Sequence, residues 1–387
     1  MKFLRIATMA LLALLILWWA WSKAGRVDDS PLPSDTPAVP ITVSSFGRAD
    51  SADGNIIGMQ PFLTAKNYAN EAGFYRELAI YMTEAKQKGL LSDKTIVVFP
   101  EYIGSWLVAA NEKTRVYDPS LSMTDALTLQ VSSNLLQFIP AYLKSKSADK
   151  TKEAIFRMKQ PEIGRIYQSV FSRLAREYGV TIVAGSAVLA SPGISADGKI
   201  ETGSGKLYNT SAVFAADGKV QSPLIRKIFP ITDEQGFTCA ADTAQSPVFS
   251  TPAGRLAVLV CADSWFPAAY QNLNDKADVI AIPSLGGVDS IWTASWNGYS
   301  GFPPPADVDT TGDYHHITEG DAWAKYAMAR RAPAVGIHHG MNVFFTGKLW
   351  DMHPEGRVLI LENDSLHVSS PAVQQGRITN LWFTRNK

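Results

Sequence analysis

Cysteine is scarce in this chain of 387 residues, since only two are present, Cys239 and Cys261. Two cysteines are too few for a disulfide scaffold or for a zinc module built from cysteine ligands. They leave room for one catalytic thiol. The alternative is a disulfide between the two, which an oxidising compartment would permit.

A surplus of charge is also missing, because 36 Lys and Arg residues balance 36 Asp and Glu residues. Proteins that bind nucleic acid normally carry a basic surplus, so this class of function is disfavoured. With 46% hydrophobic and 10% aromatic residues, the composition excludes disorder over most of the chain. The length suits one substantial α/β domain or two smaller ones.

The N-terminus carries an apolar segment without charge at residues 6–21, preceded by Lys2 and Arg5. It is shorter than the ~20 residues of a spanning helix, but the tryptophans at its end suit a membrane interface. We interpret residues 1–26 as a signal anchor, with a signal peptide cleaved near residues 22–24 as the alternative. The charge around the segment favours a body outside the cytoplasm, periplasmic or extracellular, and secreted if the segment is removed.

Prolines crowd residues 27–40 and indicate a semi-extended linker. The folded body then occupies residues 41–387. Strands are predicted at residues 56–60, 95–100, 180–189, 207–215, 256–261, 279–283, 334–338 and 358–361, and helices at 68–88, 163–178 and 321–331. This alternation favours a layered α/β domain with buried sheets.

Two stretches break the alternation, near residues 108–162 and 286–320. The first has polar flanks around a predicted helix at 125–144, and the second is rich in Gly, Pro, Trp and Asp. We interpret both as insertions, because long irregular segments of this kind often cover active sites.

Three strand ends carry residues suited to catalysis. Glu101 follows an apolar strand, where desolvation raises a carboxyl pKa toward that of a general base. Lys227 stands beside Arg226 in an apolar run, where a period of two turns one of the pair toward the core. Cys261 ends a buried strand at a sharp turn, where backbone N–H groups would lower the thiol pKa and bind an oxyanion. Each alone also fits a structural role, so the prediction depends on their combination.

In this order along the chain, three motifs resemble the Glu–Lys–Cys triad of the nitrilase, or carbon–nitrogen hydrolase, superfamily: Phe99-Pro100-Glu101, Arg226-Lys227 and Cys261-Ala262-Asp263. Weaker matches lie at residues 58–61, 208–212, 327–332 and 354–358. The resemblance covers roughly residues 55–362, interrupted by the two insertions. It implies an α-β-β-α sandwich, a fold that tends to pair its subunits, so a homodimer is one alternative for an oligomeric state that the sequence leaves open.

The resemblance also implies roles for the matching residues. Cys261 would attack a carbonyl or nitrile carbon and form a thioester. Glu101 would move the protons, and Lys227 with the Ala262 backbone N–H would hold the oxyanion. Many relatives carry a second glutamate after the lysine, and Glu234 is the candidate, with Asp233 as its competitor. No cofactor or metal is expected.

One departure bears on the reaction. True nitrilases usually have Trp-Glu after the cysteine, whereas Ala262-Asp263 stands here. This is closer to the amidase branches, so cleavage of a small-molecule amide is predicted. Residues 330–342 also resemble apolipoprotein N-acyltransferases, in which an amine takes the acyl group. Those enzymes have a multi-span membrane domain, which one short apolar segment cannot replace, so acyl transfer is the second reading.

Two alternative functions lie outside amide cleavage and acyl transfer. One is a metal-binding protein, and the other is a non-catalytic binding protein on the same fold. The candidate metal ligands are His315, His316, Glu319, Asp321, His338 and His339. No HExxH-type signature is present, which counts against the metal. A binding site without catalytic activity would not need Glu, Lys and Cys together, which counts against the non-catalytic binding protein. Four tryptophans, Trp265, Trp292, Trp296 and Trp323, either line an apolar pocket or pack under the second insertion.

Overall fold

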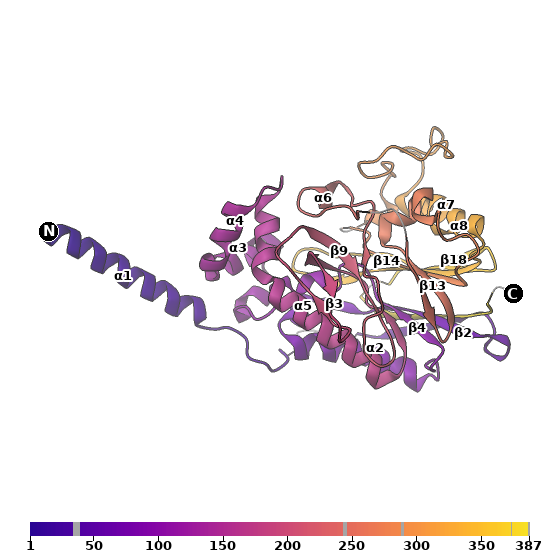
Figure 1. The fold of residues 1–387 in the computed structure, drawn as a ribbon, viewed down its shortest axis with the longest axis horizontal. Coiled ribbons are helices and arrows are strands. Elements are labelled where there is room, and N and C mark those ends of the chain that lie inside the picture. Colours follow the sequence, from indigo (N-terminus) through magenta and orange to yellow (C-terminus); the bar gives the residue numbers. More distant parts are fainter. Residues whose placement is uncertain (34–38, 243–245, 288–289, 373, 386–387) are drawn as a thin grey trace.

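The structure is a computed structural model, and it describes residues 1–33, 39–242, 246–287, 290–372 and 374–385. Two six-stranded sheets pack face to face, with helices on the outer face of each (Figure 1). This arrangement confirms the predicted α-β-β-α sandwich. Of the predicted linker, residues 34–38 lie outside the described residues, as do residues 288–289 of the second predicted insertion.

The first sheet has the order β1-β19-β2-β4-β5-β10. Its strands are β1 (Ile41–Phe46), β19 (Gly376–Phe383), β2 (Gly54–Gln60), β4 (Thr95–Val98), β5 (Thr181–Val183) and β10 (Val213–Phe214). β2, β4 and β5 are parallel to one another. β19 lies between β1 and β2, so the last strand of the chain completes the sheet that the first strands begin.

The second sheet has the order β12-β13-β14-β15-β17-β18. Its strands are β12 (Val248–Thr251), β13 (Gly254–Val258), β14 (Val279–Ser284), β15 (His339–Phe344), β17 (Leu359–Glu362) and β18 (Ser365–Val368). A smaller sheet joins β11 (Ile225–Arg226), β9 (Leu207–Ser211) and β6 (Ala187–Ala190). β13, β14 and β15 are parallel, so their carboxyl ends share one edge.

The two large sheets approach closely at Gly58. A Cβ atom there would lie 2.6 Å from Met341 Sδ and 2.9 Å from Val343 Cγ2 on the facing sheet. Because neither contact leaves room for a methyl group, only glycine allows this spacing. The close approach brings the carboxyl ends of β4, β13 and β14 toward one another.

Helices cover the outer faces. α2 (Glu71–Gln87) and α5 (Lys150–Tyr178) pack on the first sheet, and α7 (Glu319–Tyr326) and α8 (Met328–Arg331) pack on the second. The Asn70 side chain accepts the Gly73 N–H at the start of α2, and α5 ends at Gly179 in the left-handed conformation. These are ordinary helix caps.

Three predicted strands differ from the observed ones. The predicted strand at 334–338 is wrong, because Pro333–Val335 forms a 3₁₀ turn and β15 begins only at His339. Pro333 lacks an N–H for a strand, and Gly336 has a φ of 77°. The predicted strand at 180–189 divides into β5 and β6 at Gly185, whose φ is 62°. The predicted strand at 207–215 divides into β9 and β10, which lie in different sheets.

The predicted helix at 125–144 consists of two helices, α3 (Met123–Ser133) and α4 (Leu135–Lys144). They meet at Asn134, whose φ of −128° and ψ of 30° are not helical. With the first part of α5, they fill the first predicted insertion.

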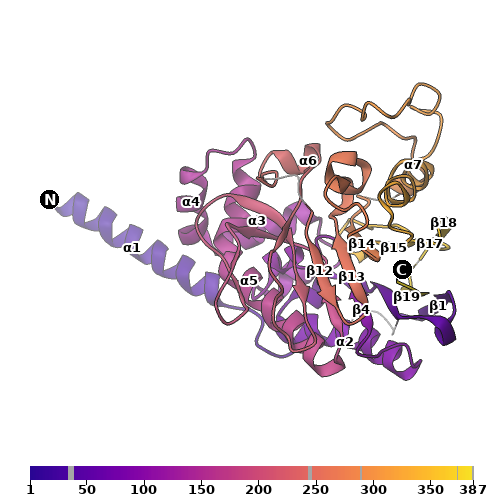
Figure 2. The ribbon, with the colours of Figure 1, turned by 45° about the vertical axis from the view of Figure 1, so that its right-hand side comes forward.

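The N-terminal helix α1 (Lys2–Lys23) projects from the body (Figures 1 and 2). Among the described residues it is the one helix long and apolar enough to cross a membrane, judged by length and composition alone. A signal sequence meets the same criterion.

Candidate functional site

Glu101 is placed by the turn that follows β4. The Phe99 N–H donates to the Val183 carbonyl at 3.0 Å, and Tyr102 adopts a φ of 63°. This positive φ turns the chain sharply and directs the carboxylate between the sheets. Glu101 is 1% exposed, and its Oε2 accepts the backbone N–H of Leu285 at 2.9 Å, just after β14.

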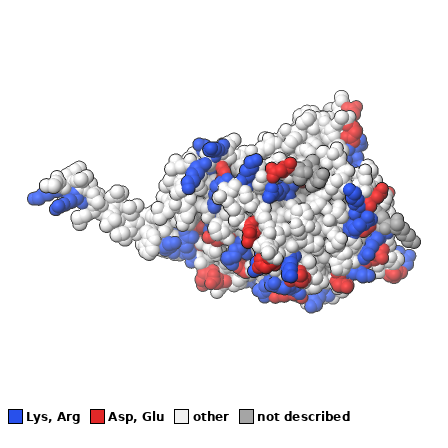
Figure 3. All heavy atoms as spheres, viewed as in Figure 1, with Lys and Arg blue, Asp and Glu red and all other residues white. Residues whose placement is uncertain are grey.

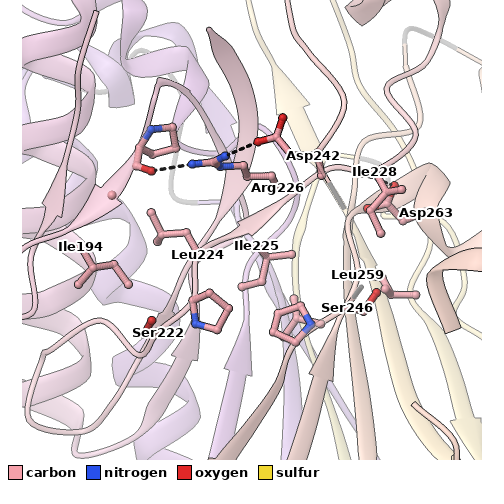
Figure 4. Close-up of a pocket in the computed structure, with 16 residues that line it drawn as sticks. Ile194, Ser222, Leu224, Ile225, Arg226, Ile228, Asp242, Ser246, Leu259 and Asp263 are labelled. Atoms are coloured by element: carbon pink, nitrogen blue, oxygen red, sulfur yellow. Dashed lines mark hydrogen bonds and ion pairs between the residues drawn. The ribbon is translucent and has the colours of Figure 1, made fainter. Parts of the chain in front are cut away.

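Lys227 follows β11 and points inward. Its N–H donates to the Asn209 carbonyl at 2.9 Å, which continues the pairing of β11 with β9. Lys227 Nζ lies 2.9 Å from Glu101 Oε1. The neighbouring Arg226 points the other way, toward Asp242 at 3.2 Å and the Pro192 carbonyl at 3.0 Å (Figure 4). The period of two thus sends the lysine to the interior and the arginine outward.

A second carboxylate reaches Lys227 from α6 (Thr232–Gln235). Glu234 Oε2 lies 2.5 Å from Lys227 Nζ and accepts the Ile231 N–H at 2.9 Å. Glu234 is buried, whereas Asp233 is exposed on the outer side of the same short helix. Of the two candidates, the structure therefore brings Glu234 to the lysine.

Two further side chains join this network, and neither was predicted as a site residue. Asn209 Nδ2 donates to Glu101 Oε1 and to Glu234 Oε1, each at 2.8 Å. The Tyr102 hydroxyl donates to the same Glu234 oxygen at 2.8 Å. Asn209 lies within the matching segment at 208–212 and Tyr102 directly follows Glu101, so both positions carried a sequence signal.

Cys261 begins a 3₁₀ turn, Cys261–Trp265, that follows β13. Its φ is 51°, an unusual value for a residue with a side chain. The residue is 4% exposed, and its Sγ lies 3.9 Å from the carbonyl of Leu285, the residue whose N–H Glu101 accepts. Ala262 is next in this turn and half-buried. Glu101 thus pairs with Lys227 and meets Cys261 at Leu285, which bonds to both.

Asp263 ties the cysteine turn to the lysine segment. Its Oδ1 accepts the backbone N–H groups of Ile228 at 2.9 Å and Phe229 at 2.7 Å. Its Oδ2 accepts the N–H of Val260 at 3.3 Å. One buried carboxylate therefore fixes the chain on both sides of Cys261 and just after Lys227.

The electrostatics follow from burial and from these pairs. Burial raises the pKa of Glu101, even though Lys227 opposes the rise. Burial alone would lower the pKa of Lys227, but the charges of Cys261, Glu101 and Glu234 outweigh it and raise that pKa well above its usual range. For Glu234, burial acts to raise the pKa, and Lys227 outweighs it and lowers the pKa. The lysine is therefore held protonated between two carboxyl groups.

The expected lowering of the Cys261 pKa is wrong. Burial, followed by the charge of Glu101, raises the thiol pKa well above its usual value, and Lys227 opposes this only in part. A turn that supplies backbone N–H groups favours a thiolate only when the sulfur is not also buried beside a carboxylate. Burial and the charge of Glu101 thus favour the protonated thiol.

Glu101, Lys227, Glu234 and Cys261 do not line the cavity that Figure 4 shows. A cavity of about 390 Å³ lies on the other side of β11, and its lining includes Leu224, Arg226, Ile228 and Asp263 (Figure 4). Glu101 and Lys227 are each 1% exposed. Asp263 thus stands between this cavity and the almost fully enclosed Glu–Lys–Cys cluster.

The tryptophans pack against one another under the second insertion. The rings of Trp265 and Trp323 meet edge to face with centroids 4.8 Å apart, and Trp296 stacks on Trp265 at 6.1 Å. Trp292 meets Phe344 edge to face at 5.1 Å. All four tryptophans are buried, so the packing interpretation fits the structure.

The candidate metal ligands do not gather in the structure. No group of three or more His, Cys, Asp or Glu residues within the described part of the chain is placed to hold a metal ion. His338 Nδ1 lies 2.7 Å from Asp364 Oδ1, His339 packs against the Phe383 ring, and His315 lies against Tyr314. Cys239 and Cys261 are both free thiols.

Comparison with known proteins identifies the family. Residues 56–299 match the profile of the family described as carbon–nitrogen hydrolase. This segment is more than half of the chain. The chain belongs to the carbon–nitrogen hydrolase family. This match confirms the resemblance drawn from the sequence to the nitrilase, or carbon–nitrogen hydrolase, superfamily.

Other members resemble this hydrolase over part or most of its length. The probable hydrolase YhcX of Bacillus subtilis (strain 168) is 30% identical over 118 residues, which are 30% of this chain and 20% of that relative. The aligned segment thus spans about a fifth of the curated relative. A mutant of the Nesterenkonia AN1 amidase from the nitrilase superfamily superposes with a TM-score of 0.50 at 13% identity, covering 87% of this chain and 93% of the amidase. The amidase from Nesterenkonia sp. gives a TM-score of 0.47 at 15% identity, with 83% and 88% covered.

Proposed function

We propose that this carbon–nitrogen hydrolase cleaves the amide bond of a small molecule, with Cys261 as the nucleophile. The observation that carries the proposal is the position of Glu101, which accepts the N–H of Leu285, the residue whose carbonyl contacts the Cys261 thiol, and lies 2.9 Å from Lys227 Nζ. A thiol with a raised pKa needs an adjacent base, and Glu101 is that base. The raised pKa of Glu101 reduces the pKa difference between its carboxyl group and the thiol, which favours proton transfer between them.

The steps then follow in order. Glu101 accepts the thiol proton as Sγ attacks the carbonyl carbon, and the carbonyl oxygen becomes an oxyanion. Lys227 and the Ala262 backbone N–H stabilise that oxyanion. As the carbon–nitrogen bond breaks, Glu101 gives its proton to the leaving amine, and the acyl group remains on Cys261 as a thioester. Glu101 next takes a proton from water as the water oxygen attacks the thioester carbon. When the carbon–sulfur bond breaks, Glu101 returns that proton to the Cys261 sulfur, and the carboxylic acid leaves.

Glu234 has a supporting role in this proposal. Its carboxylate lies 2.5 Å from Lys227 Nζ and helps to hold the lysine protonated at the pH of the reaction. Asn209 donates to both carboxylates, so it keeps Glu101 and Glu234 at a fixed separation despite their like charge. Tyr102 and Asn209 thereby position the groups that contact the substrate.

We also propose that α1 is a signal anchor that holds the catalytic body at the membrane, outside the cytoplasm. Lys113 Nζ donates to the carbonyl of Ala24 at 2.5 Å and to that of Trp21. Arg26 donates to Asn111 at 2.8 Å and pairs with Glu112 at 3.3 Å. These contacts seat the end of α1 on the body, which suits a retained helix.

The experiment uses the full chain in mild detergent with a panel of simple amides, N-acyl amino acids and nitriles. We expect release of ammonia or an amine from an amide, and an acyl or alkylated adduct that mass spectrometry locates on Cys261. Cys261→Ala should abolish turnover, because it removes the attacking sulfur, while Cys239→Ala serves as the matched control and retains most of it. Turnover that survives in Cys261→Ala would exclude the thiol mechanism. Activity that appears only when an acyl-carrying lipid and an amine acceptor are supplied would favour acyl transfer instead.

A further inference from the structure

Exposed apolar side chains are concentrated on α4. Beyond α1 and the Met1 that precedes it, the described residues include seven large hydrophobic side chains that are exposed, and four belong to this ten-residue helix: Leu136, Ile139, Tyr142 and Leu143. Leu143 is 75% exposed and Leu136 is 66% exposed. Leu136, Ile139 and Leu143 follow one another at helical spacing and form one apolar stripe, which we call the α4 stripe. Such a stripe on a protein surface marks an interaction site.

The helix that carries the stripe packs on the body through the partly buried side chain of Phe138. Phe138 stacks on Tyr142 with centroids 5.7 Å apart, and Phe138 also packs against the core beneath α5. Just past the helix, the Ser145 hydroxyl donates to the buried carboxylate of Glu153 on α5. The α4 stripe is therefore a fixed feature of the surface.

The stripe lies beside the base of α1. Trp18 Nε1 donates to the Ser132 carbonyl at 2.9 Å, close to the junction between α3 and α4. Arg26 Nη2 donates to Asn134 Oδ1 at 2.8 Å, at that junction itself. Glu112 links this site to the body, because it pairs with Arg26 at 3.3 Å and with Lys159 at 2.8 Å. Figures 1 and 2 both show α3 and α4 on the side of the body from which α1 projects.

This geometry sets the depth of α4 when α1 spans a bilayer. Tryptophan side chains prefer the level of the lipid headgroups, and Trp18, Trp19 and Trp21 occupy the end of α1 nearest the body. Since Trp18 is bonded to Ser132, the start of α4 lies at the same level. The α4 stripe then faces the boundary between headgroups and acyl chains.

The charges near the stripe match a lipid surface. Between residues 126 and 148 the only charged residues are Lys144 and Lys146, at the end of α4 and just beyond it, and both are exposed. Figure 3 shows blue side chains gathered over the region of α3 and α4, on the same side as α1. Lysines at a membrane surface attract anionic headgroups, and no carboxylate in this segment opposes them.

We infer that α4 lies in the membrane interface as a second, in-plane contact with the lipid bilayer. This inference depends on the proposed anchoring by α1 and adds a surface that the catalytic chemistry does not require. A second copy of the chain fits less well, because a stable dimer buries about 800 Å² on each partner, and one short helix with four apolar side chains offers only part of that area. With α1 and α4 both in contact with lipid, the body has one fixed orientation above the membrane.

The test places an environment-sensitive fluorophore on Leu143→Cys in the full chain, with Cys239→Ser and Cys261→Ala to remove the native thiols. The matched control carries the fluorophore on Ile80→Cys, an exposed apolar position on α2 that is 46% exposed. Both proteins are placed in phosphatidylcholine vesicles containing phosphatidylglycerol. We expect lipid-borne spin labels to quench position 143 at least threefold more strongly than position 80, and iodide in the water to quench it at least threefold less. Leu136→Cys should repeat the result, since both positions are exposed and neither substitution removes a core contact.

Three outcomes would overturn the inference. Equal quenching by iodide at positions 143 and 80 would place α4 in water. Protection of position 143 from both iodide and lipid quencher would indicate cover by protein, as a second copy would give. A chain that fails to float with the vesicles would overturn the anchoring by α1 and this inference with it, whereas a chain that floats with position 143 in water overturns this inference alone. Replacing Lys144 and Lys146 by Gln should weaken lipid quenching in the anionic vesicles, while the same change at Lys86 and Lys88, at the C-terminal end of α2, should not.

Discussion

The Lys227 ammonium lies 2.5 Å from Glu234 Oε2, although the two residues are separated by the turn that opens α6. Both groups are buried, so their attraction is screened little by water. Glu234 is the closer of the two carboxylates beside the lysine, since Glu101 Oε1 lies 2.9 Å from the same nitrogen.

The first prediction concerns that carboxylate. Glu234→Gln should lower kcat on the order of 10-fold to 10²-fold, because Lys227 loses a charge that raises its pKa. The alkaline limb of the pH–rate profile should move to lower pH for the same reason. Asp233→Asn, one residue away and exposed, is the control and should change neither quantity. A Glu234→Gln enzyme with an unchanged alkaline limb would remove Glu234 from the network.

The second prediction concerns Lys227 itself. Lys227→Met should reduce kcat on the order of 10² or more, the usual effect of losing an oxyanion donor. It should also lower the free energy of unfolding by about 3–5 kcal/mol, because buried Glu101 and Glu234 lose their partner. Arg226→Met tests the neighbouring position, whose side chain points away, and should leave turnover nearly intact. Near-normal turnover in Lys227→Met, measured beside a denaturation curve, would end the triad proposal.

The third prediction concerns the pH dependence of Glu101. The proposed base must be ionised to accept the thiol proton, and burial raises its pKa above 4.5. We therefore expect kcat/KM to fall as pH decreases through a value above that of an ordinary glutamate. Glu101→Gln should lose on the order of 10² or more in kcat and retain no acid limb in that range. An acid limb that is the same in Glu101→Gln would assign it to another group.

The fourth prediction concerns Asp263, whose pKa burial raises to about 7 from 3.8. The folded protein then holds a proton that the unfolded chain releases, so this residue's contribution to stability is complete below about pH 4 and is lost as pH rises to about 7. Asp263→Asn has no such proton. The free energy of unfolding of Asp263→Asn minus that of the parent protein should therefore increase between pH 4 and 7 and stay level above 7.

Denaturant unfolding followed by circular dichroism at several pH values, in one detergent, measures this difference. A difference that does not change with pH would mean that Asp263 titrates normally when folded. A difference that decreases with rising pH would mean that the three backbone N–H groups at Asp263 outweigh its burial.

Much of the candidate site could be predicted because its residues stand at strand ends. Glu101, Lys227 and Cys261 each follow a short apolar run, and these runs form β4, β11 and β13 of three different sheets. The choice of Glu234 over Asp233 required the structure, since the two differ only in which side of one helical turn they occupy. The Cys261 pKa was mispredicted because burial depends on how closely the whole site is packed, which local sequence does not reveal.

The fold was predictable in class and less so at its edges. Runs of β-branched residues indicated the central strands β2, β4, β13 and β14. β1 and β19 were missed because they pair with each other across most of the chain length, and no local pattern reveals such a partner. The division of 207–215 between two sheets was also hidden, since Ala212 carries no turn signal of its own.

The place of β19 has a consequence for how the protein is made. β1 pairs only with β19 among the described residues, and β19 separates it from β2. Synthesis runs from the N-terminus. The backbone groups of β1 and of the outer edge of β2 therefore lack their hydrogen-bond partners in β19 until residues 376–383 have left the ribosome. Unpaired strand edges invite pairing with other chains. A chain cut short before Gly376 would keep the residues of the Glu–Lys–Cys cluster and yet expose two open edges, which makes it a ready target for aggregation and proteolysis.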